Sequence, residues 1–429
     1  MSKEKRTSQI LRLDFFGEAF EAMRDIAAYI PFQYAMGMQL NPYSLFILSV
    51  LLWGCGTSWE GSLPVTGSSL PSLTATSTAT STRVLEIHVI NVQQGDATFI
   101  IGPNGTTVLI DGGNTGKGTD DVVPYLEGLG HVPGKGLDYM IASHRDADHI
   151  GGMDEVIQAG YDVRKNIWDN GSTATGTVAI RQFLEVATTT TAGAVQTMPL
   201  GEIIDLGDGA KITAVAVGGQ VIGQPKPSSP LDENDMSVAL LVQYNGFDYI
   251  TAGDLGGGND GDAGCTGRTT TSQENIESLL AWALIPKGGG GLLTQNGVEV
   301  LHVNHHGSES STNHEWMNRL SPAVALIQVG SGGGGFEHPR KAVVENVLLA
   351  HSICVTAAPA LVLQTDEGGA ATSTNTSTAG YVVGDIVIKT TGQGTFDVSG
   401  SGRKRNESPD ERIVAGVHPN APRQIPFDK

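Results

Sequence analysis

The 429-residue sequence predicts an α/β protein. Two observations support this prediction. Between residues 84 and 390, β-branched runs of strand length alternate with segments of helical spacing, which is typical of sheets covered by helices. Acidic and histidine side chains also follow several of the predicted strands directly. In α/β sheets the loops that leave neighbouring strands converge at that edge and build the functional site.

The first half of this segment is expected to begin with a strand at 84–92 and a hairpin at 97–113. A Pro-Asn-Gly turn signal separates the two strands of the hairpin. Residues 120–130 have helical spacing and end in glycine, so they predict a helix. Residues 137–144 predict another strand, and a helix should follow the glycine pair at 151–152.

The second half is expected to hold a hairpin at 235–254, because an Asn-Gly pair lies between two apolar runs. Residues 166–230 show no clear pattern apart from one β-branched run. A helix is expected around 273–283, after a glycine-rich stretch. The remaining predicted strands are 211–217, 298–306, 323–330, 360–365 and 385–390.

Side chains that bind metals gather at the ends of the predicted strands. The stretch SHRDADHIGG (143–152) contains four of them: His144, Asp146, Asp148 and His149. Neighbouring side chains of an extended segment point in opposite directions, so four on one strand cannot share one ion, although a turn allows two ions. Asp254 and a histidine at 305 or 306 bring the set to about six ligands, enough for a two-metal centre.

These residues lie in motifs that resemble the metallo-β-lactamase fold. The pattern HxDxDHxGG from His144 is similar to that of the metallohydrolase domain of ComEC-type DNA-uptake proteins and their stand-alone relatives. The other matching motifs, in the order of that family, are NVQQGD (91–96), LIDGG (109–113), ENDMSV (233–238), GD (253–254), HHGSESS (305–311) and HP (338–339). The resemblance covers roughly 84–390. It implies a four-layered αβ/βα sandwich of two mixed sheets.

The resemblance also implies two metal sites. The first would contain His144 and Asp146. The implied ligands of the second are Asp148, His149 and one histidine of the 305–306 pair. His305 is preferred over His306 as that histidine, and Asp254 would bridge the ions. Because oxygen ligands favour Mn²⁺ or Mg²⁺ relative to Zn²⁺, the expected cofactors are two divalent ions, Zn²⁺ or Mn²⁺, with Mg²⁺ as a further candidate.

The remaining motif residues suggest roles around the metals. Asp148 would also position the attacking water. His338 would protonate the leaving group or bind substrate, unless it is only a turn histidine before proline. Ser308 and Ser311 would hold phosphate oxygens; alternatively, Ser311 or Thr312 caps the helix that follows.

The sequence departs from the family pattern in two places. It has no histidine between His149 and His302, where the usual fold supplies one ligand; Asp235, Asn234 or water would take that place. In the opening motif, asparagine and glutamine stand where the family has aspartate and glycine, and Asp96 closes the motif. Asp96 and Asp111 are expected to orient ligands or substrate without binding a metal themselves.

The two ends of the chain differ from its centre. The apolar stretch within 44–55 is about ten residues long, whereas a membrane-spanning helix needs roughly 20. It suits a secretory signal and ends in LWGC, which resembles a bacterial lipobox with Cys55 as the lipidated residue. The alternative is a buried apolar helix. The three cysteines are too few for a disulfide scaffold, and a Cys265–Cys354 bridge remains open.

The expected organisation therefore has four parts. These are a leader (1–55), a Ser/Thr-rich tether (56–83), a metallo-β-lactamase-like catalytic domain (84–400) and a charged tail (401–429). A signal followed by a tether predicts export, as a bacterial lipoprotein at the cell surface or in the periplasm. If 44–55 is not a signal, the protein is cytoplasmic. Membrane contact is expected only through the lipid anchor.

The expected function is that of a metal-dependent phosphodiesterase, a nuclease by analogy with the ComEC-type domain, with DNA or RNA as its partner. One alternative is hydrolysis of a lactone, thioester or β-lactam, and another is a non-catalytic surface binding module. Residues 84–400 contain 14 Lys and Arg against 35 Asp and Glu, and no basic strip is evident. Such a surface suits cations better than a long polyanion. No protein partner is inferred.

Overall fold

The computed structural model describes residues 83–259, 266–268, 271–293, 297–331, 336–369, 374–401 and 423–427. The chain divides into two units, Met1–Thr78 and Ala79–Lys429, and every described residue belongs to the second. The predicted leader, Cys55 and nearly all of the tether therefore lie outside the described residues, as does Cys265. Cys354 is disulfide-bonded. Within the described ranges, no helix has the length and apolar character needed to cross a membrane.

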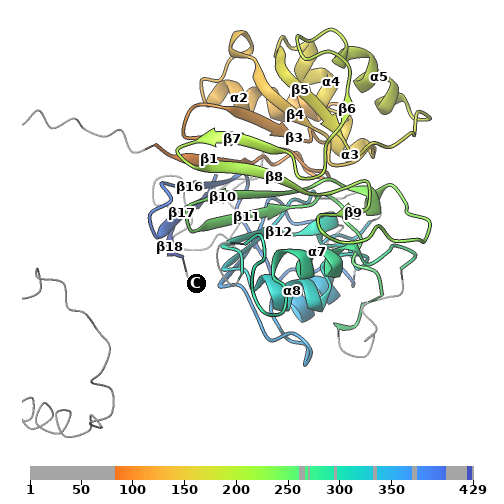
Figure 1. The fold of residues 1–429 in the computed structure, drawn as a ribbon, viewed down its shortest axis with the longest axis vertical. Helices are drawn as coiled ribbons and strands as arrows, with labels where there is room; N and C mark the ends of the chain where they lie inside the picture. Colours follow the sequence, from red (N-terminus) through yellow and green to blue (C-terminus); the bar gives the residue numbers. More distant parts are fainter. Residues whose placement is uncertain are drawn as a thin grey trace, which may run out of the picture. The chain divides into compact units, whose positions relative to one another are not determined.

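The first of two nine-stranded sheets is built mainly from the beginning and the end of the domain (Figure 1). Its strands β1 to β3 are antiparallel, and β3 to β6 are parallel. In sheet order its strands are β18 (Arg423–Pro426), β17 (Thr395–Gly400), β16 (Ile386–Thr390), β1 (Leu85–Val89), β2 (Thr98–Ile101), β3 (Thr107–Ile110), β4 (Leu137–Ile141), β5 (Val163–Asp169) and β6 (Gln196–Thr197).

The second sheet comes from the middle of the chain and is also mixed. Strands β11 to β15 are parallel, whereas β7, β8, β10 and β11 pair antiparallel. In sheet order its strands are β15 (Tyr381–Val382), β14 (Leu361–Gln364), β13 (Val324–Ile327), β12 (Val300–His302), β11 (Phe247–Thr251), β10 (Ala239–Tyr244), β8 (Ala210–Val217) and β7 (Ile203–Gly207), with β9 (Gln220–Val221) paired to β8.

Helices cover the outer face of each sheet, which makes four layers (Figure 1). The central core lies between the sheets and contains buried side chains of both, such as Ile87, Leu240 and Val300. A second core packs helices against the first sheet: α2 (Val123–Gly128), α4 (Met153–Gln158) and α5 (Val178–Ala187). A third packs α7 (Ile276–Leu284), α8 (His314–Leu320) and the π-helix η6 (Ala342–Leu348) against the second sheet. The predicted αβ/βα sandwich is therefore confirmed.

Both predicted hairpins are present, as β2–β3 and β10–β11. The largest omission of the sequence analysis is in 166–230, where β5, α5 and β7 had no prediction. Strand β5 reads VRKNIWD and exposes its charged residues in the first half, so its apolar alternation is interrupted. Part of the predicted tail also contributes structure, because residues 423–426 form β18 on the edge of the first sheet.

Candidate metal centre

Four loops, each following a strand, meet at one edge of the two sheets. Asp111 follows β3, and the loop after β4 carries the cluster from His144 to His149. Asp254 follows β11, and the turn after β12 carries the pair His305 and His306. The strands of both sheets thus bring together side chains that are up to 195 positions apart, from 111 to 306.

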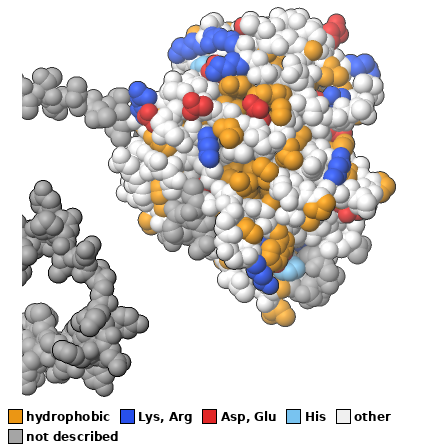
Figure 2. All heavy atoms as spheres, viewed as in Figure 1, with side chains coloured by type: hydrophobic (Ala, Val, Ile, Leu, Met, Phe, Trp, Pro, Cys, Tyr) orange, Lys and Arg blue, Asp and Glu red, His pale blue; other side chains and the backbone are white. Residues whose placement is uncertain are grey.

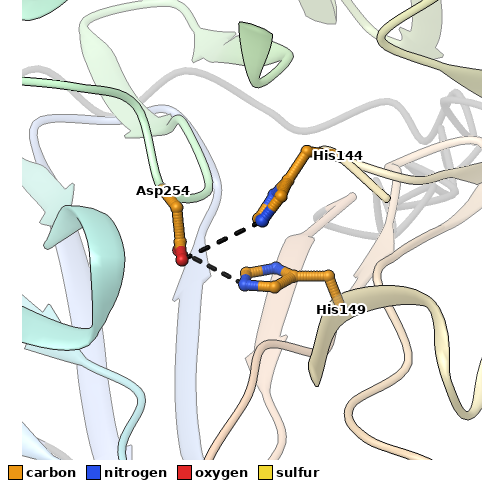
Figure 3. Close-up of side chains that lie close together, drawn as sticks. All are labelled: His144, His149 and Asp254. Carbon is orange, nitrogen blue, oxygen red and sulfur yellow. Dashed lines mark ion pairs between the residues drawn. The ribbon is translucent and has the colours of Figure 1, made fainter. Parts of the chain in front are cut away.

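Asp254 is the centre of the cluster and is 3% exposed. Its Oδ1 lies 3.3 Å from His149 Nε2 and 3.7 Å from His306 Nε2. Its Oδ2 lies 3.4 Å from His305 Nε2 and 3.9 Å from His144 Nε2. Figure 3 shows the carboxylate facing the rings of His144 and His149. Each carboxylate oxygen therefore faces a different pair of histidines.

Two further carboxylates of the 144–149 loop approach the same imidazoles. Asp146 Oδ2 lies 3.6 Å from His144 Nε2, and Asp148 Oδ2 lies 3.4 Å from His306 Nε2. Both aspartates are more exposed than Asp254, and the side of the cluster on which they lie is called its mouth here. The structure thus brings together all the ligands implied by the HxDxDH pattern and places Asp254 among them, where a bridging carboxylate was expected.

The imidazoles are prepared to bind cations. Burial leaves Nε2 of His144, His149 and His306 without a hydrogen-bond partner among the described residues. Their Nδ1 atoms are engaged by the protein. Nδ1 of His306 lies 3.0 Å from the Gln328 carbonyl oxygen, which can only accept, so that Nδ1 carries the proton. This tautomer leaves the lone pair on Nε2, facing the carboxylates, as metal ligation requires. The buried polar atoms therefore fit a metal centre.

The charges of the cluster stabilise one another. Burial raises the pKa of the Asp254 carboxyl, but His305, His149 and His306 outweigh it and hold that pKa well below its usual value. Burial lowers the pKa of His149, but Asp254 and Asp111 outweigh it and hold that pKa well above the usual value. The carboxylates thus attract positive charge into a buried place, and metal ions would supply it.

Asp111 and Asp96 lie behind the ligands. Asp111 Oδ2 lies 2.9 Å from His149 Nδ1, and its two oxygens accept hydrogen bonds from the backbone N–H and hydroxyl of Ser143, both at 2.7 Å. Asp96 Oδ1 lies 3.3 Å from His306 Nδ1. Both carboxylates are buried and contact the side of an imidazole that faces away from the cluster. Both carboxylates can orient an imidazole from there, and both also lie in groups that could hold an ion themselves.

Replacement of Asp111 with Asn is expected to weaken metal binding by about 10- to 100-fold, because His149 loses the carboxylate that fixes its tautomer and raises its basicity. Competition with a chromophoric chelator measures the affinity. Glu185→Gln on the exposed face of α5 is the matched control and should leave the affinity unchanged. Equal affinities of the Asp111 variant and the parent would show that Asp111 does not support the centre.

Asp235 does not fill the place of the missing mid-chain histidine, which corrects the sequence prediction. It lies in the short 3-10 helix η4 (Asn234–Met236) and is 1% exposed. Its Oδ1 accepts a hydrogen bond from the backbone of Glu274 at 3.0 Å, and its Oδ2 accepts one from Asp232 at 3.2 Å. Burial raises the pKa of Asp235 to about 7. Asp235 therefore fixes loops, and no hydrogen bond between described residues joins the Asn234 side chain to the centre.

Ser311 has neither of the roles considered for it. Its side chain is fully buried, and its hydroxyl donates to the Leu255 carbonyl oxygen at 2.8 Å, so it is not available to a substrate phosphate. The cap of α8 is Asn313, whose Oδ1 accepts a hydrogen bond from Trp316 N–H at 2.8 Å; Thr312 is not the cap either. The Ser308 hydroxyl lies 3.0 Å from that of Ser310.

His338 lies beside the histidine pair. Its ring centroid is 5.5 Å from that of His305 and 6.2 Å from that of His306. Its Nδ1 is buried without a hydrogen-bond partner among the described residues. Burial and these two histidines lower the pKa of His338 to about 3. A neutral imidazole is better suited to hydrogen bonding with a substrate than to supplying a proton.

Several residues that position the ligands were not identified from the sequence. The backbone N–H of Arg145, between two predicted ligands, donates to Glu233 Oε1 at 2.9 Å. Its guanidinium donates twice to Asp169 Oδ2, at 2.8 and 2.6 Å. Arg145 and Asp169 are both buried. The sequence offered one signal for these contacts, which is the presence of an arginine between two potential metal ligands.

The histidine pair is held in an unusual backbone conformation. His305 and His306 have φ of 51° and 52°, in the left-handed region that non-glycine residues seldom adopt. Behind the turn, Glu277 is fully buried. It accepts hydrogen bonds from the Asn304 amide and the Thr312 N–H at 2.6 Å, and from the Asn313 N–H at 2.8 Å. Such strain persists where the surroundings determine it strongly, as at functional sites.

The comparisons with known proteins agree with this centre. A model described as metallo-beta-lactamase superfamily matches residues 90–225. ComE operon protein 3 of Bacillus subtilis (strain 168) is 25% identical over 300 residues, 66% of this chain and 32% of that protein. Competence protein ComA of Neisseria gonorrhoeae is 26% identical over 263 residues, 61% of this chain and 28% of that protein. The chain thus spans about a third or less of the length of these curated relatives.

Among solved structures, the metallo-beta-lactamase fold protein YhfI from Bacillus subtilis is similar over 72% of this chain and 100% of that chain, with 13% identity and a TM-score of 0.37. The family assignment depends instead on the superfamily model and the distant relatives. The chain is a metallo-β-lactamase superfamily protein with distant homology to ComE operon protein 3 and ComA. Its buried His/Asp cluster contains groups of side chains that could hold metal ions, as a metallohydrolase requires.

Proposed function

We propose that this superfamily protein is a metal-dependent phosphodiesterase that acts on nucleic acid. The proposal rests on the position of the Asp254 carboxylate. Its two oxygens face separate pairs of histidines, as a carboxylate shared by two ions would. Two-metal centres of this kind serve phosphatases and nucleases. The resemblance of the motifs to those of ComEC-type DNA-uptake proteins supports a nucleic-acid substrate. Zn²⁺ or Mn²⁺ are the proposed ions, with Mg²⁺ as the third candidate.

Three side chains near the centre would assist the two ions in the reaction. When bound, the two ions would activate a water molecule and stabilise the negative charge that develops on the phosphoryl group. Asp148, at the mouth of the cluster and 26% exposed, is placed to accept a hydrogen bond from that water. His338, whose ring centroid lies 5.5 Å from that of His305, would contact the substrate beside the centre. Ser308 remains a candidate for a phosphate contact.

An exposed aromatic side chain next to the centre supports nucleic acid over a compact substrate. Phe336 is 60% exposed, and its ring centroid lies 5.8 Å from that of His338. Aromatic side chains on which bases stack are typical of proteins that bind single strands. Lys and Arg side chains on the face drawn in Figure 2 form small separate groups instead of a continuous strip. The exposed ring therefore favours a single-stranded segment, whose bases are free to stack, over a duplex.

Replacement of Phe336 with Leu is expected to raise KM for single-stranded DNA roughly five- to 150-fold, since base stacking contributes about 1–3 kcal/mol. The kcat should change little, because Phe336 does not contact the ligands. Steady-state kinetics on a fluorescent oligonucleotide measure both constants. Leu292→Ala, at another exposed apolar position, is the control. An unchanged KM would remove Phe336 from the substrate site.

The test of the function is an assay of metal-free protein, reloaded with Mn²⁺, Mg²⁺ or Zn²⁺, on single-stranded DNA and on bis(p-nitrophenyl) phosphate. A Asp148→Asn/His149→Asn variant reports the centre, and Glu185→Gln is the matched surface control. We expect metal-dependent DNA cleavage that the first variant loses. Cleavage of the small diester alone would contradict the nucleic-acid assignment and indicate a small or cell-wall phosphodiester.

The same assay separates the alternative functions. Metal binding without cleavage of either phosphodiester would refute the proposal and favour a carboxylic substrate, which lactone, thioester and β-lactam panels would then identify. If those panels also fail, the surface binding module is the remaining reading. The buried ligand set argues against that outcome, because a binding module has no need of unpartnered imidazole nitrogens around a carboxylate.

Export as a lipoprotein is proposed together with this function. The signal-like stretch at 44–55 and the lipobox-like sequence before Cys55 support it. The disulfide bond of Cys354 agrees with an oxidising compartment outside the cytoplasm. Cell fractionation of a tagged chain and of its Cys55→Ala variant tests the proposal. Membrane association that the variant loses would support lipidation, and a cytoplasmic pool in both would contradict it.

A further inference from the structure

The two adjacent histidines of the HHGS motif approach different oxygens of Asp254. His305 Nε2 lies 3.4 Å from Oδ2, and His306 Nε2 lies 3.7 Å from Oδ1. The motif resemblance assigned one of them to the centre and left the other without a role. Because their rings are inclined at 77° with centroids 6.2 Å apart, they do not compete for one position.

The backbone explains how neighbouring residues reach one carboxylate. In an extended strand, adjacent side chains point to opposite faces, so only one of the two could reach the centre. Both residues instead have positive φ, in the turn η5 (Asn304–Gly307) that directly follows β12. This left-handed turn directs both rings toward Asp254. The conformational cost is understandable if both imidazoles are needed there.

Each histidine joins a different half of the cluster. His306 lies with Asp148 and His149, around Asp254 Oδ1. Around Oδ2 lie His144 and His305, and Asp146 approaches His144 from the mouth. His144 and His305 are joined through the shared carboxylate oxygen, and His144 also lies with His149 and Asp254 in a group that could hold an ion. In the usual fold, a mid-chain histidine supplies one further ligand to the centre. This chain lacks that histidine, and the Asp235 carboxylate does not take its place.

We propose that His305 and His306 ligate different ions, and that His305 supplies the ligand that the missing mid-chain histidine would otherwise provide. Ligand atoms about 2.1 Å from a tetrahedral ion lie roughly 3.4 Å apart. The separations around Oδ2, from 3.4 to 3.9 Å, are of that size. The two ions would then share Asp254, with His306 on the Oδ1 side and His305 on the Oδ2 side.

The second imidazole nitrogen of His305 supports this role. Its Nδ1 lies 2.8 Å from the Ser310 hydroxyl, which in turn lies 3.0 Å from the Ser308 hydroxyl. The partner of Nδ1 fixes the ring with Nε2 toward Asp254, as Gln328 does for His306. His305 is 18% exposed, so the rival role is contact with the substrate instead of an ion.

Metal counting without substrate separates the two roles and does not depend on which bond the enzyme cleaves. We would load the parent and His305→Asn with Mn²⁺, remove free metal, and measure bound Mn²⁺ by mass spectrometry and by electron paramagnetic resonance. Asn tolerates positive φ, so the turn should be kept. His351→Asn at an exposed position is the matched control, and circular dichroism verifies folding.

The parent and the control should bind two ions with the spectrum of a coupled pair. His305→Asn should bind one ion, with the six-line spectrum of isolated Mn²⁺, and Asp146→Asn should show the same loss. The double variant should lose no further ion. His305→Gly provides a second folded variant if Asn disturbs the turn. Two coupled ions in His305→Asn, or in His305→Gly, would overturn the proposal and assign His305 to the substrate.

Discussion

Replacement of Asp254 with Asn is expected to remove both metal ions and to lower the rate of hydrolysis by more than about 100-fold. Loss of a residue that only hydrogen-bonds a metal ligand costs up to about 100-fold, and loss of a shared ligand should cost more. Both oxygens of Asp254 face imidazoles, so one substitution affects both halves of the centre. The amide has one acceptor oxygen and no charge. It would leave His149 and His306 close together without the carboxylate that compensates them.

The control for this prediction is Asp235→Asn. Asp235 is as buried as Asp254 and lies near it in the sequence, but its oxygens accept backbone hydrogen bonds outside the centre. This variant should lose stability and keep both ions, as measured by equilibrium dialysis and elemental analysis. Two ions bound to the Asp254 variant, or none bound to the Asp235 variant, would contradict the assignment of the ligands.

The second large effect is on stability. Glu277→Ala is expected to lower the free energy of unfolding by about 3–5 kcal/mol, the cost of breaking a buried charged network by removing one partner. Glu277 is fully buried and accepts hydrogen bonds from Asn304, Thr312 and Asn313. Arg268 is also buried, and its positive charge interacts with the Glu277 carboxylate. Without that carboxylate, the buried guanidinium would lose a compensating negative charge. Urea unfolding at fixed metal concentration measures the change.

Glu185→Ala is the control and should change stability by less than about 0.5 kcal/mol, as exposed substitutions usually do. Because Glu277 supports the turn of His305 and His306, its variant should also bind metal more weakly in the folded state. A loss of stability with unchanged metal affinity would show that the turn keeps its conformation without Glu277. A change below about 1 kcal/mol would show that the network is not cooperative.

The sequence predicted the parts of the centre that lie within short motifs. Asp111, the 144–149 cluster and Asp254 each follow a predicted strand, and the α/β order implies that such positions converge. The sandwich architecture followed from the motif order. The motifs were less informative about adjacent residues. His305 and His306 were predicted to be alternative ligands, but the structure brings both to Asp254.

The remaining features depend on backbone conformation and on partners distant in the sequence. Nothing in the letters HHGS shows that two consecutive histidines adopt positive φ. Gln328 supports His306 from β13's end, and its only signal was a polar residue inside an apolar run. Glu277 gave a similar signal in α7. The position of Asp235 could not be predicted, because its Oδ1 accepts a hydrogen bond from a loop 39 residues away.

The most direct test of the account is the activity of metal-free protein as Mn²⁺ is added in known equivalents. Single-stranded DNA is the substrate, and bound metal is counted in the same samples. We expect no cleavage without metal and a rise in rate that follows occupation of the second metal site. Cleavage that is independent of metal, or no cleavage with two ions bound, would contradict it.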